Sequence, residues 1–441
     1  MTLEKSDSST PVTLPRRSLL IIFGVSIVTA IGNTGMQSVL PAIGRQIGFK
    51  DYLVAGIFSL SALLWGFVSP YWARQSDLKG RKPLMLIGLT GFMVSMICCG
   101  LVVAAGVRHL ATPLVIFVFF LLSRALFGLL GSASNPATQA YVAERTHRDQ
   151  RTDAMAGLAG AFGLGTIIGP AVAPLFVLGF VGLSGPMFAF AAMAAGMMVL
   201  VIRYLPESRA GIVAHGTLDR SRAPASARGS VMRDPRITPF LIYGFLLASC
   251  QTAQGQSLGF LIIDKLHLPP MRAQGFTAVA MMAGAVAGLL AQWGLIRMFR
   301  LGPRDLLRWG AGLAAAANLL VAFAPSYSAV VIGYALSSLG YGFCRPGFTA
   351  GASLAVGLAE QARAAGAIAA VNGISVVAAP AFVWLYGIWG PAPFLLNAAV
   401  LAGLLLYALF NGVLRGAGEA PTTENETALA SLERNQEGVS V

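Results

Sequence analysis

Long apolar segments fill most of this chain, and ionisable residues are almost absent from them. Twelve segments contain no Asp, Glu, Lys or His, and the two arginines inside them are Arg124 and Arg345. A lipid core cannot hydrogen-bond to an open backbone, so apolar stretches of this length are expected to cross a membrane as helices. The sequence therefore predicts an all-α membrane protein. The expected spans are residues 18–40, 53–73, 83–107, 112–140, 154–180, 183–202, 237–263, 274–296, 309–327, 328–357, 364–388 and 391–414.

Charged residues are scarce, and most of the basic ones lie on one face of the predicted membrane protein. Only 11% of residues are charged and the mean hydropathy is +0.71, whereas soluble domains carry about 25% charged residues. Of the 31 Lys and Arg residues, 24 fall in the tails and in loops that share one face, and 5 fall on the other face. Cytoplasmic loops are the basic ones in membrane proteins, so both termini are expected in the cytoplasm. The net charge of +13 is thus explained by membrane topology and not by a nucleic-acid partner. A multi-pass protein of the cell inner membrane is expected.

A polar stretch divides the chain into two sets of six spans. The predicted order is a cytoplasmic tail (1–17), a six-helix bundle (18–204), a cytoplasmic linker (205–236), a second bundle (237–414) and a cytoplasmic C-terminal tail (415–441). Matching dipeptides in the two halves indicate an internal repeat, which is typical of transporters. The matches are Gln37-Ser38 with Gln256-Ser257, Asn135-Pro136 with Arg345-Pro346, and Gly169-Pro170 with Ala379-Pro380, the last two by one shift of 210 residues.

The loop between the second and third spans reads ARQSDLKGRKPLML. It resembles the loop signature of the major facilitator superfamily, G-x-L-A-D-R-x-G-R-K. The matching positions are Asp77, Gly80, Arg81 and Lys82, whereas Ala73 and Leu78 replace the first glycine and the first arginine of the signature. The resemblance implies the major facilitator fold, with two pseudo-symmetric six-helix bundles. It also implies a charge relay between Asp77 and Arg81 that holds the outward-open state.

The fourth span is similar to the antiporter signature of that superfamily. Arg124 and Gly128 match it, and Phe127 stands where a glutamine is usual. Glu144 occupies the acidic position at its end, and the resemblance implies that Glu144 pairs with Arg81 of the neighbouring loop.

The fifth span carries Gly165, Gly169 and Pro170 in the pattern G-x-x-x-G-P. Small residues let two helices approach closely, and proline bends a helix. The pattern is similar to the signature of the twelve-span drug:proton antiporters, which are exporters of the multidrug and tetracycline type. Alternating access is expected by rocking of the two bundles, with the fifth and eleventh spans at their interface.

Polar side chains inside the spans are the candidate substrate contacts. Such groups are costly in hydrocarbon, so they mark helix contacts or a wet transport route. Arg124 and Arg345 have no carboxylate inside the spans, which predicts a positive cavity that attracts anions and tolerates neutral compounds. The candidates are Arg124, Arg345, Asn33, Gln37, Gln251, Gln254, Gln256, Tyr334 and Asn372. The nearest acids at the outer face, Asp51 and Asp264, are the candidate proton-coupling residues.

These features predict a secondary active exporter of a small organic molecule that works by proton antiport. The favoured substrate is anionic, such as a carboxylate metabolite or a siderophore, or neutral. Two alternatives stay open: efflux of lipophilic drugs and antibiotics, and import of an organic anion. No nucleophile–base set, metal-ligand spacing or phosphate loop occurs in the sequence, so no enzyme activity, cofactor or metal is expected. The expected partners are the substrate, protons and the lipid bilayer, with a monomer as the functional unit.

Overall fold

The computed structural model describes residues 16–146, 148–179, 181–206, 234–356 and 360–418. Over these residues the chain is built from helices and contains no β-strand. The predicted linker and both predicted tails lie largely outside the described residues.

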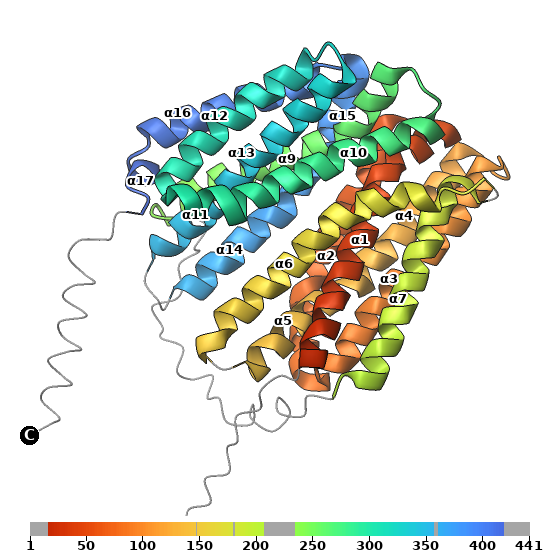
Figure 1. The fold of residues 1–441 in the computed structure, drawn as a ribbon, viewed down its shortest axis with the longest axis horizontal. Coiled ribbons are helices and arrows are strands. Elements are labelled where there is room, and N and C mark those ends of the chain that lie inside the picture. Colours follow the sequence, from red (N-terminus) through yellow and green to blue (C-terminus); the bar gives the residue numbers. More distant parts are fainter. Residues whose placement is uncertain (1–15, 147, 180, 207–233, 357–359, 419–441) are drawn as a thin grey trace, which may run out of the picture.

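The first half folds into a bundle whose helices follow the predicted spans (Figure 1). Short turns join the helices, and Gly80 adopts φ 94° between α2 and α3, a backbone conformation that glycine reaches without strain. A 3-10 turn, η1, interrupts the fourth span at Gly131–Ala133. The helices are α1 (Arg16–Ile47), α2 (Asp51–Lys79), α3 (Arg81–Val107), α4 (Pro113–Leu130), α5 (Ser134–Arg145), α6 (Arg148–Val172) and α7 (Gly185–Tyr204), with the 3-10 turns η2 (Ala173–Phe176) and η3 (Gly182–Ser184).

The second half repeats this arrangement. A π-helical segment, η7 (Leu290–Leu295), continues the eighth span, and a 3-10 turn, η8 (Ser375–Ala378), interrupts the eleventh. The tenth span is separated from the ninth by a turn around Pro325, as the sequence predicts. The helices are α9 (Thr238–Leu266), α10 (Pro270–Leu289), α11 (Ile296–Phe299), α12 (Pro303–Ala322), α13 (Tyr327–Leu354), α14 (Gln361–Ile374), α15 (Ala379–Ile388), α16 (Ala392–Phe410) and α17 (Gly412–Arg415).

Ten helices of the described chain are long and apolar enough to cross a membrane. Two further long helices complete the twelve spans: α9, whose middle carries three glutamines, and α12, whose first turns carry Arg304, Asp305 and Arg308. The predicted fold class, an all-α membrane protein with twelve helical spans in two bundles, is therefore confirmed.

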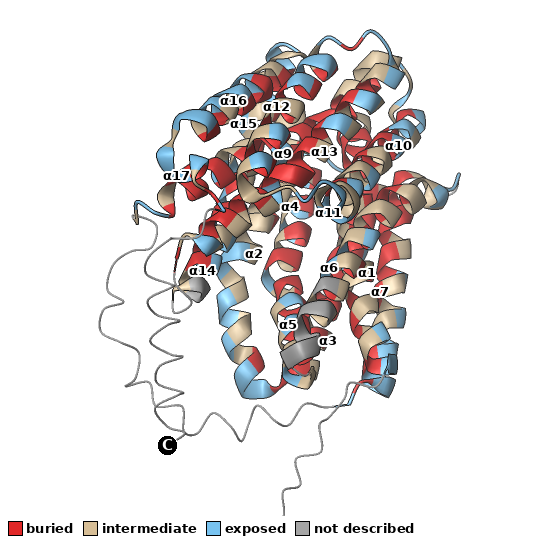
Figure 2. Ribbon diagram, turned by 60° about the vertical axis from the view of Figure 1, so that its left-hand side comes forward, coloured by how far each residue is buried: buried red, intermediate tan, exposed pale blue. Residues whose placement is uncertain are grey.

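Large apolar side chains cover the outside of the bundles. Phe67, Trp309 and Phe410 are 77%, 70% and 82% exposed, and Figure 2 shows exposed positions along the outer faces with buried positions between the helices. An apolar surface of this extent is unfavourable in water and matches the hydrocarbon of a bilayer. The burial pattern therefore fits a protein surrounded by lipid.

The two halves meet along the fifth and eleventh spans, as the sequence predicts. Helix α6 of the fifth span packs against α10 of the second half, and α15 of the eleventh span packs against α2 of the first half. Gly165 and Gly169 of α6 face α1 of their own half, where a β-carbon on Gly169 would lie 2.6 Å from the Ile31 carbonyl. The glycines therefore allow α1 and α6 to approach closely within the first bundle.

The two ends of the molecule each contain an arginine in an ion-pair cluster, and they are called the Arg45 end and the Arg81 end. The Arg45 end contains the last turn of α1, the start of α2 and the last turns of α9 and α15. The Arg81 end contains the start of α3, the last turns of α2 and α5 and the starts of α9 and α14. At the Arg81 end, the start of α14 in the second half lies apart from the last turn of α5 in the first half in both views (Figures 1 and 2).

Candidate functional site

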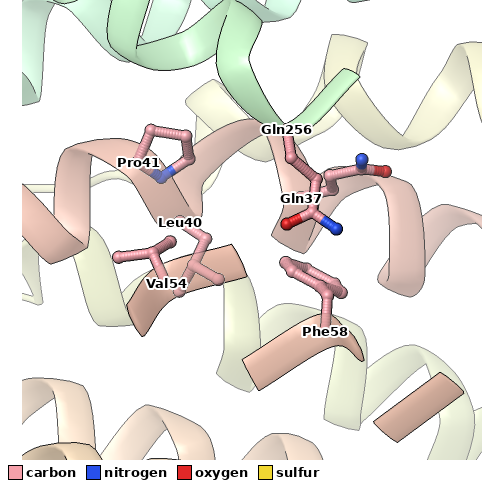
Figure 3. A pocket seen from close by; sticks show the side chains of 6 residues that line it. All are labelled: Gln37, Leu40, Pro41, Val54, Phe58 and Gln256. Atoms are coloured by element: carbon pink, nitrogen blue, oxygen red, sulfur yellow. The ribbon is translucent and has the colours of Figure 1, made fainter. Parts of the chain in front are cut away.

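A small pocket lies where the two halves meet (Figure 3). It is formed by α1 and α2 of the first half and by α9 of the second, and its volume of about 10 Å³ leaves room for about one water molecule. Drug-sized ligands need about 300 Å³ or more, so a substrate of that size requires the pocket to widen. The lining residues are Gln37, Leu40, Pro41, Val54, Phe58 and Gln256.

Two side-chain amides face this pocket from opposite halves. Gln37 and Gln256 approach each other across it in Figure 3. Gln256 is 7% exposed, and neither side chain makes a hydrogen bond with another described residue. Gly255 of α9 lies next to two polar groups, because a β-carbon there would be 3.5 Å from Gln37 Nε2 and 3.9 Å from the Tyr334 hydroxyl. Three of the predicted substrate contacts, Gln37, Gln256 and Tyr334, are thus brought together.

Arg124 does not reach the pocket in this structure. Its side chain is 2% exposed, and its Nη2 donates to Asn33 Oδ1 at 3.0 Å. The guanidinium lies 5.0 Å from the ring centre of Phe58 and 4.7 Å from that of Phe127, distances typical of cation–π contacts. Phe58 separates it from the pocket, since Phe58 is itself a lining residue. The predicted open positive cavity around Arg124 is absent here, because aromatic rings cover the charge.

Arg345 lies elsewhere, at a different depth. Its side chain is exposed and makes no hydrogen bond or ion pair with another described residue. Both α4 and α13 begin at the Arg45 end. With about 1.5 Å rise per residue, Arg124 lies about 16 Å along α4 from Pro113, and Arg345 lies about 27 Å along α13 from Tyr327. The two arginines therefore do not form the single positive cavity that the sequence predicts.

The remaining predicted contacts are occupied or lie outside the pocket. Gln254 is buried and donates to Ser337 Oγ at 2.7 Å, and Asn372 donates to the Ile368 carbonyl of its own helix at 3.0 Å. Gln251 is exposed and does not line the pocket. Gln254 thus joins α9 to α13 through its Nε2, whereas its buried Oε1 accepts no hydrogen bond from a described residue.

An ion-pair cluster joins the halves at the Arg45 end. Arg45 donates from Nε and Nη2 to Asp51, each at 2.7 Å, and from Nη1 and Nη2 to Asp264 at 3.0 and 3.1 Å. The Tyr386 hydroxyl donates to Asp264 Oδ2 at 2.6 Å. The two predicted coupling acids thus share one guanidinium. Sequence reasoning missed Arg45 and Tyr386, although Arg45 precedes Asp51 by six residues across a short turn.

A second cluster lies within the first half, at the Arg81 end. Arg81 Nη1 pairs with Asp77 at 2.7 Å and donates to Ser76 Oγ at 2.9 Å. Arg81 Nε donates to Glu144 Oε1 at 2.9 Å, and Nη2 contacts the same oxygen. Lys82, the last cation of the loop signature, donates to the Ile202 carbonyl of α7. The motif residues therefore tie α2, α3, α5 and α7 together.

Comparisons with known proteins agree with this architecture. The chain is 32% identical over 185 residues to Multidrug resistance protein 2 of Bacillus subtilis (strain 168), a match that covers 42% of this chain and 41% of that protein. It is 28% identical over 352 residues to Multidrug resistance protein 1 of the same organism, covering 77% and 80% of the two chains. The crystal structure of the human organic anion transporter MFSD10 (TETRAN) has the same fold, with a TM-score of 0.59, 18% identity, and coverage of 90% and 100%.

The sequence profile of the Major Facilitator Superfamily matches residues 22–380, which include all of the first bundle except its first residues and most of the second. The loop cluster around Arg81 and the paired bundles are the features expected of that family. This chain belongs to the Major Facilitator Superfamily of membrane transporters.

Proposed function

We propose that this protein is a secondary active exporter of small, uncharged lipophilic molecules, driven by proton antiport. The observation that carries the proposal is the pocket between α1, α2 and α9. Each half contributes one amide without a partner to the same space, so a bound molecule contacts both halves at once. Rocking of the halves would change such a site, as alternating access requires.

The chemistry of the pocket favours an uncharged substrate. Leu40, Pro41, Val54 and Phe58 supply an apolar wall, and the two amides supply donors and acceptors without net charge. Apolar walls with a few placed polar groups are typical of small-molecule sites. Because Phe58 and Phe127 cover Arg124, its charge contributes little attraction for an anion in this conformation. Of the anionic and neutral substrates that the sequence favours, the pocket therefore supports the neutral one, a drug-like compound.

Export, and not uptake, is supported by two observations. The relatives named above are called multidrug resistance proteins, and α6 carries the G-x-x-x-G-P pattern of exporting antiporters. The excess of Lys and Arg at the Arg81 end supports a cytoplasmic location for that end and for both termini. We accordingly propose an inner-membrane protein that acts as a monomer and releases its substrate at the Arg45 end.

Export of an organic anion is the second candidate function. Arg345 favours it, because this cation of α13 is exposed and has no partner among the described residues. An arginine fork pairs well with carboxylate or phosphate groups. In this alternative, Arg345 is the first contact for an anion entering from the Arg81 end.

Efflux from cells that lack their own drug exporters separates the two candidates. The assay compares an uncharged lipophilic dye with a polycarboxylate. With both Gln37→Leu and Gln256→Leu, we expect about tenfold lower dye efflux, because each lost hydrogen bond contributes about 0.5–1.5 kcal/mol. Gln139→Leu is the matched control, since Gln139 is exposed on α5 and bonds Asn135.

The opposite pattern would favour the anion candidate. Polycarboxylate efflux that is lost in Arg345→Ala and retained in the double glutamine variant would contradict an uncharged substrate. Dissipation of the proton gradient should stop efflux in either case, and efflux that continues would contradict proton antiport.

A further inference from the structure

The two carboxylates that share Arg45 are not equivalent. Asp51 lies six residues from Arg45 in the same half and receives two short bonds, each 2.7 Å. Asp264 lies 219 residues away in the other half and receives longer bonds of 3.0 and 3.1 Å. When the halves separate at this end, Arg45 keeps Asp51 and loses Asp264. The contact with Asp264 is therefore the one that changes during transport.

Helix position also distinguishes the two acids. Asp51 is the first residue of α2, and a negative charge is stabilised at a helix N-terminus. Asp264 lies two residues before the end of α9, where the helix dipole disfavours a negative charge. The side chain of Asp264 is 43% exposed, against 15% for Asp51. Asp264 is thus the carboxylate that water reaches more easily.

We propose that Asp264 is the proton-exchanging residue of the Arg45 end, and that its protonation releases the contact between the two halves. A proton from the surrounding water binds a carboxylate oxygen of Asp264, and the Arg45 guanidinium stays paired with Asp51. A neutral carboxyl group holds a guanidinium less strongly than a carboxylate does. Acid therefore favours opening at this end. The inference rests on the alternating access proposed above and reduces the two coupling candidates to one.

The charged and titratable groups that face Asp264 within the described residues are Arg45, Asp51 and Tyr386. The adjacent Lys265 points away and donates to the Ala324 carbonyl. Tyr386 belongs to the same half as Asp264, so its hydrogen bond survives when the halves part.

Apolar contacts between the two halves lie next to the Arg45 cluster. They also hold the Arg45 end closed, so the ion pair with Asp264 contributes only part of the closing free energy. A β-carbon on Gly259 would overlap Pro41, so α9 and α1 touch directly one turn away. The Phe260 ring lies 5.6 Å from the Arg45 guanidinium carbon. These contacts do not depend on pH. Protonation of Asp264 should accordingly change the ratio of open to closed molecules severalfold, without an all-or-none switch.

Spin-label distances across the Arg45 end test this proposal on the purified, full-length protein in lipid nanodiscs. Leu110→Cys and Ser328→Cys place labels on exposed positions of the two halves, after replacement of the native cysteines. On acidification from about pH 8 to about pH 5, we expect the open population to increase about threefold to fivefold, the effect of losing one exposed ion pair. In Asp264→Asn the open population should be raised at all pH values and should not respond to acid.

Asp51→Asn is the matched control, because it removes a carboxylate from the same guanidinium and leaves Asp264 in place. Its acid response should persist. An acid response that survives in Asp264→Asn, or that disappears in Asp51→Asn alone, would overturn the assignment.

The uncharged dye provides a separate readout in the same sample. If the dye changes the label distance and acid does not, the proton site at Asp264 is wrong and the proposed transport cycle stands. If neither the dye nor acid moves the labels, both proposals fail.

Discussion

The ion-pair clusters at the Arg45 end and at the Arg81 end contain the same kinds of residue but connect different parts of the molecule. In each cluster one arginine holds two carboxylates. At the Arg81 end all three groups belong to the first half, and the arginine side chain is 9% exposed. At the Arg45 end one carboxylate comes from the second half, and the arginine is 31% exposed. The first cluster lies within one bundle and the second connects the two bundles, so we propose that only the second forms and breaks as the bundles move.

Helix α1 runs between the two ends of the molecule. It carries Arg45, lines the pocket and packs along α6. The largest predicted effect is therefore a change that displaces α1. A β-carbon on Gly169 would overlap the Thr34 hydroxyl and lie 2.8 Å from the Gly35 amide nitrogen. We expect Gly169→Leu to abolish transport and to destabilise the first bundle by about 2–3 kcal/mol through overpacking.

Thermal unfolding and dye efflux measure this effect together. Gly196→Leu is the matched control, because a β-carbon on Gly196 of α7 meets no neighbouring atom within 4 Å. Normal efflux in Gly169→Leu would mean that α1 and α6 do not need their close contact, and the two ends would then be mechanically independent.

The second prediction isolates the Arg81 end. Arg81→Ala leaves Asp77 and Glu144 close together without their shared cation. Breaking a buried ion pair costs about 3–5 kcal/mol, and the partial exposure of both carboxylates lowers our expectation to about 2 kcal/mol of stability. Arg81→Lys should recover only part of this loss, since one ammonium cannot reproduce the guanidinium geometry.

The comparison between the ends predicts that the label distance at the Arg45 end stays the same in folded Arg81→Ala. A changed distance there would contradict the view that this cluster acts within one half. It would instead support a relay from the loop motif to the opposite end of the molecule.

The sequence was informative about the fold because the lipid core imposes one simple rule. Each apolar segment became a helical span, since charged side chains end the spans at the membrane surface. Most boundaries lie within five residues of the predicted ones, whereas α1 and α2, for example, end seven and six residues later than predicted. The pairing of Arg81 with Glu144 was also expected, from the family signature. Gln37 and Gln256 stood out because amides are rare in apolar spans, and both line the pocket.

The rest depended on helix rotation, which single-sequence patterns do not specify in spans that are apolar all round. Whether Arg124 faces a cavity or aromatic rings is decided by the orientation of Phe58 on a different helix. The link from Arg45 to Asp264 spans 219 residues, and neither residue is unusual in a loop. A count of charges therefore suggested an anion site, whereas their positions separate Arg124 from Arg345.

Salt provides a third and smaller test of the difference between the ends. Exposed ion pairs are screened as the Debye length falls from about 10 Å at 0.1 M to about 3 Å at 1 M salt. Raising NaCl over this range should open the Arg45 end about twofold in the spin-label assay, because the Arg45–Asp264 pair is partly exposed. The stability contributed by the more buried Arg81 cluster should change less. Equal salt sensitivity of the two would remove burial as the distinction between them.

The smallest predicted effect concerns a third cluster, at the Arg81 end of the second half. Arg236 donates to Asp234 at 2.8 Å and to Glu360 at 3.1 Å, and its side chain is 52% exposed. The Arg236 guanidinium holds the pKa of Asp234 below its usual range. A carboxyl group with a lowered pKa stabilises the folded protein above its unfolded-state pKa, and this contribution disappears as the pH falls through the lowered value.

Water screens this exposed cluster, so Asp234→Asn should change stability by no more than about 0.5 kcal/mol. Thermal unfolding at neutral pH and at about pH 3 measures the difference, which should vanish in acid because the wild-type carboxylate is then increasingly protonated. A loss as large as that of Arg81→Ala would show that an arginine shared between two acids is equally stabilising wherever it lies. The difference between the two ends would then not be explained by the burial of each cluster, or by whether its residues come from one half or from both.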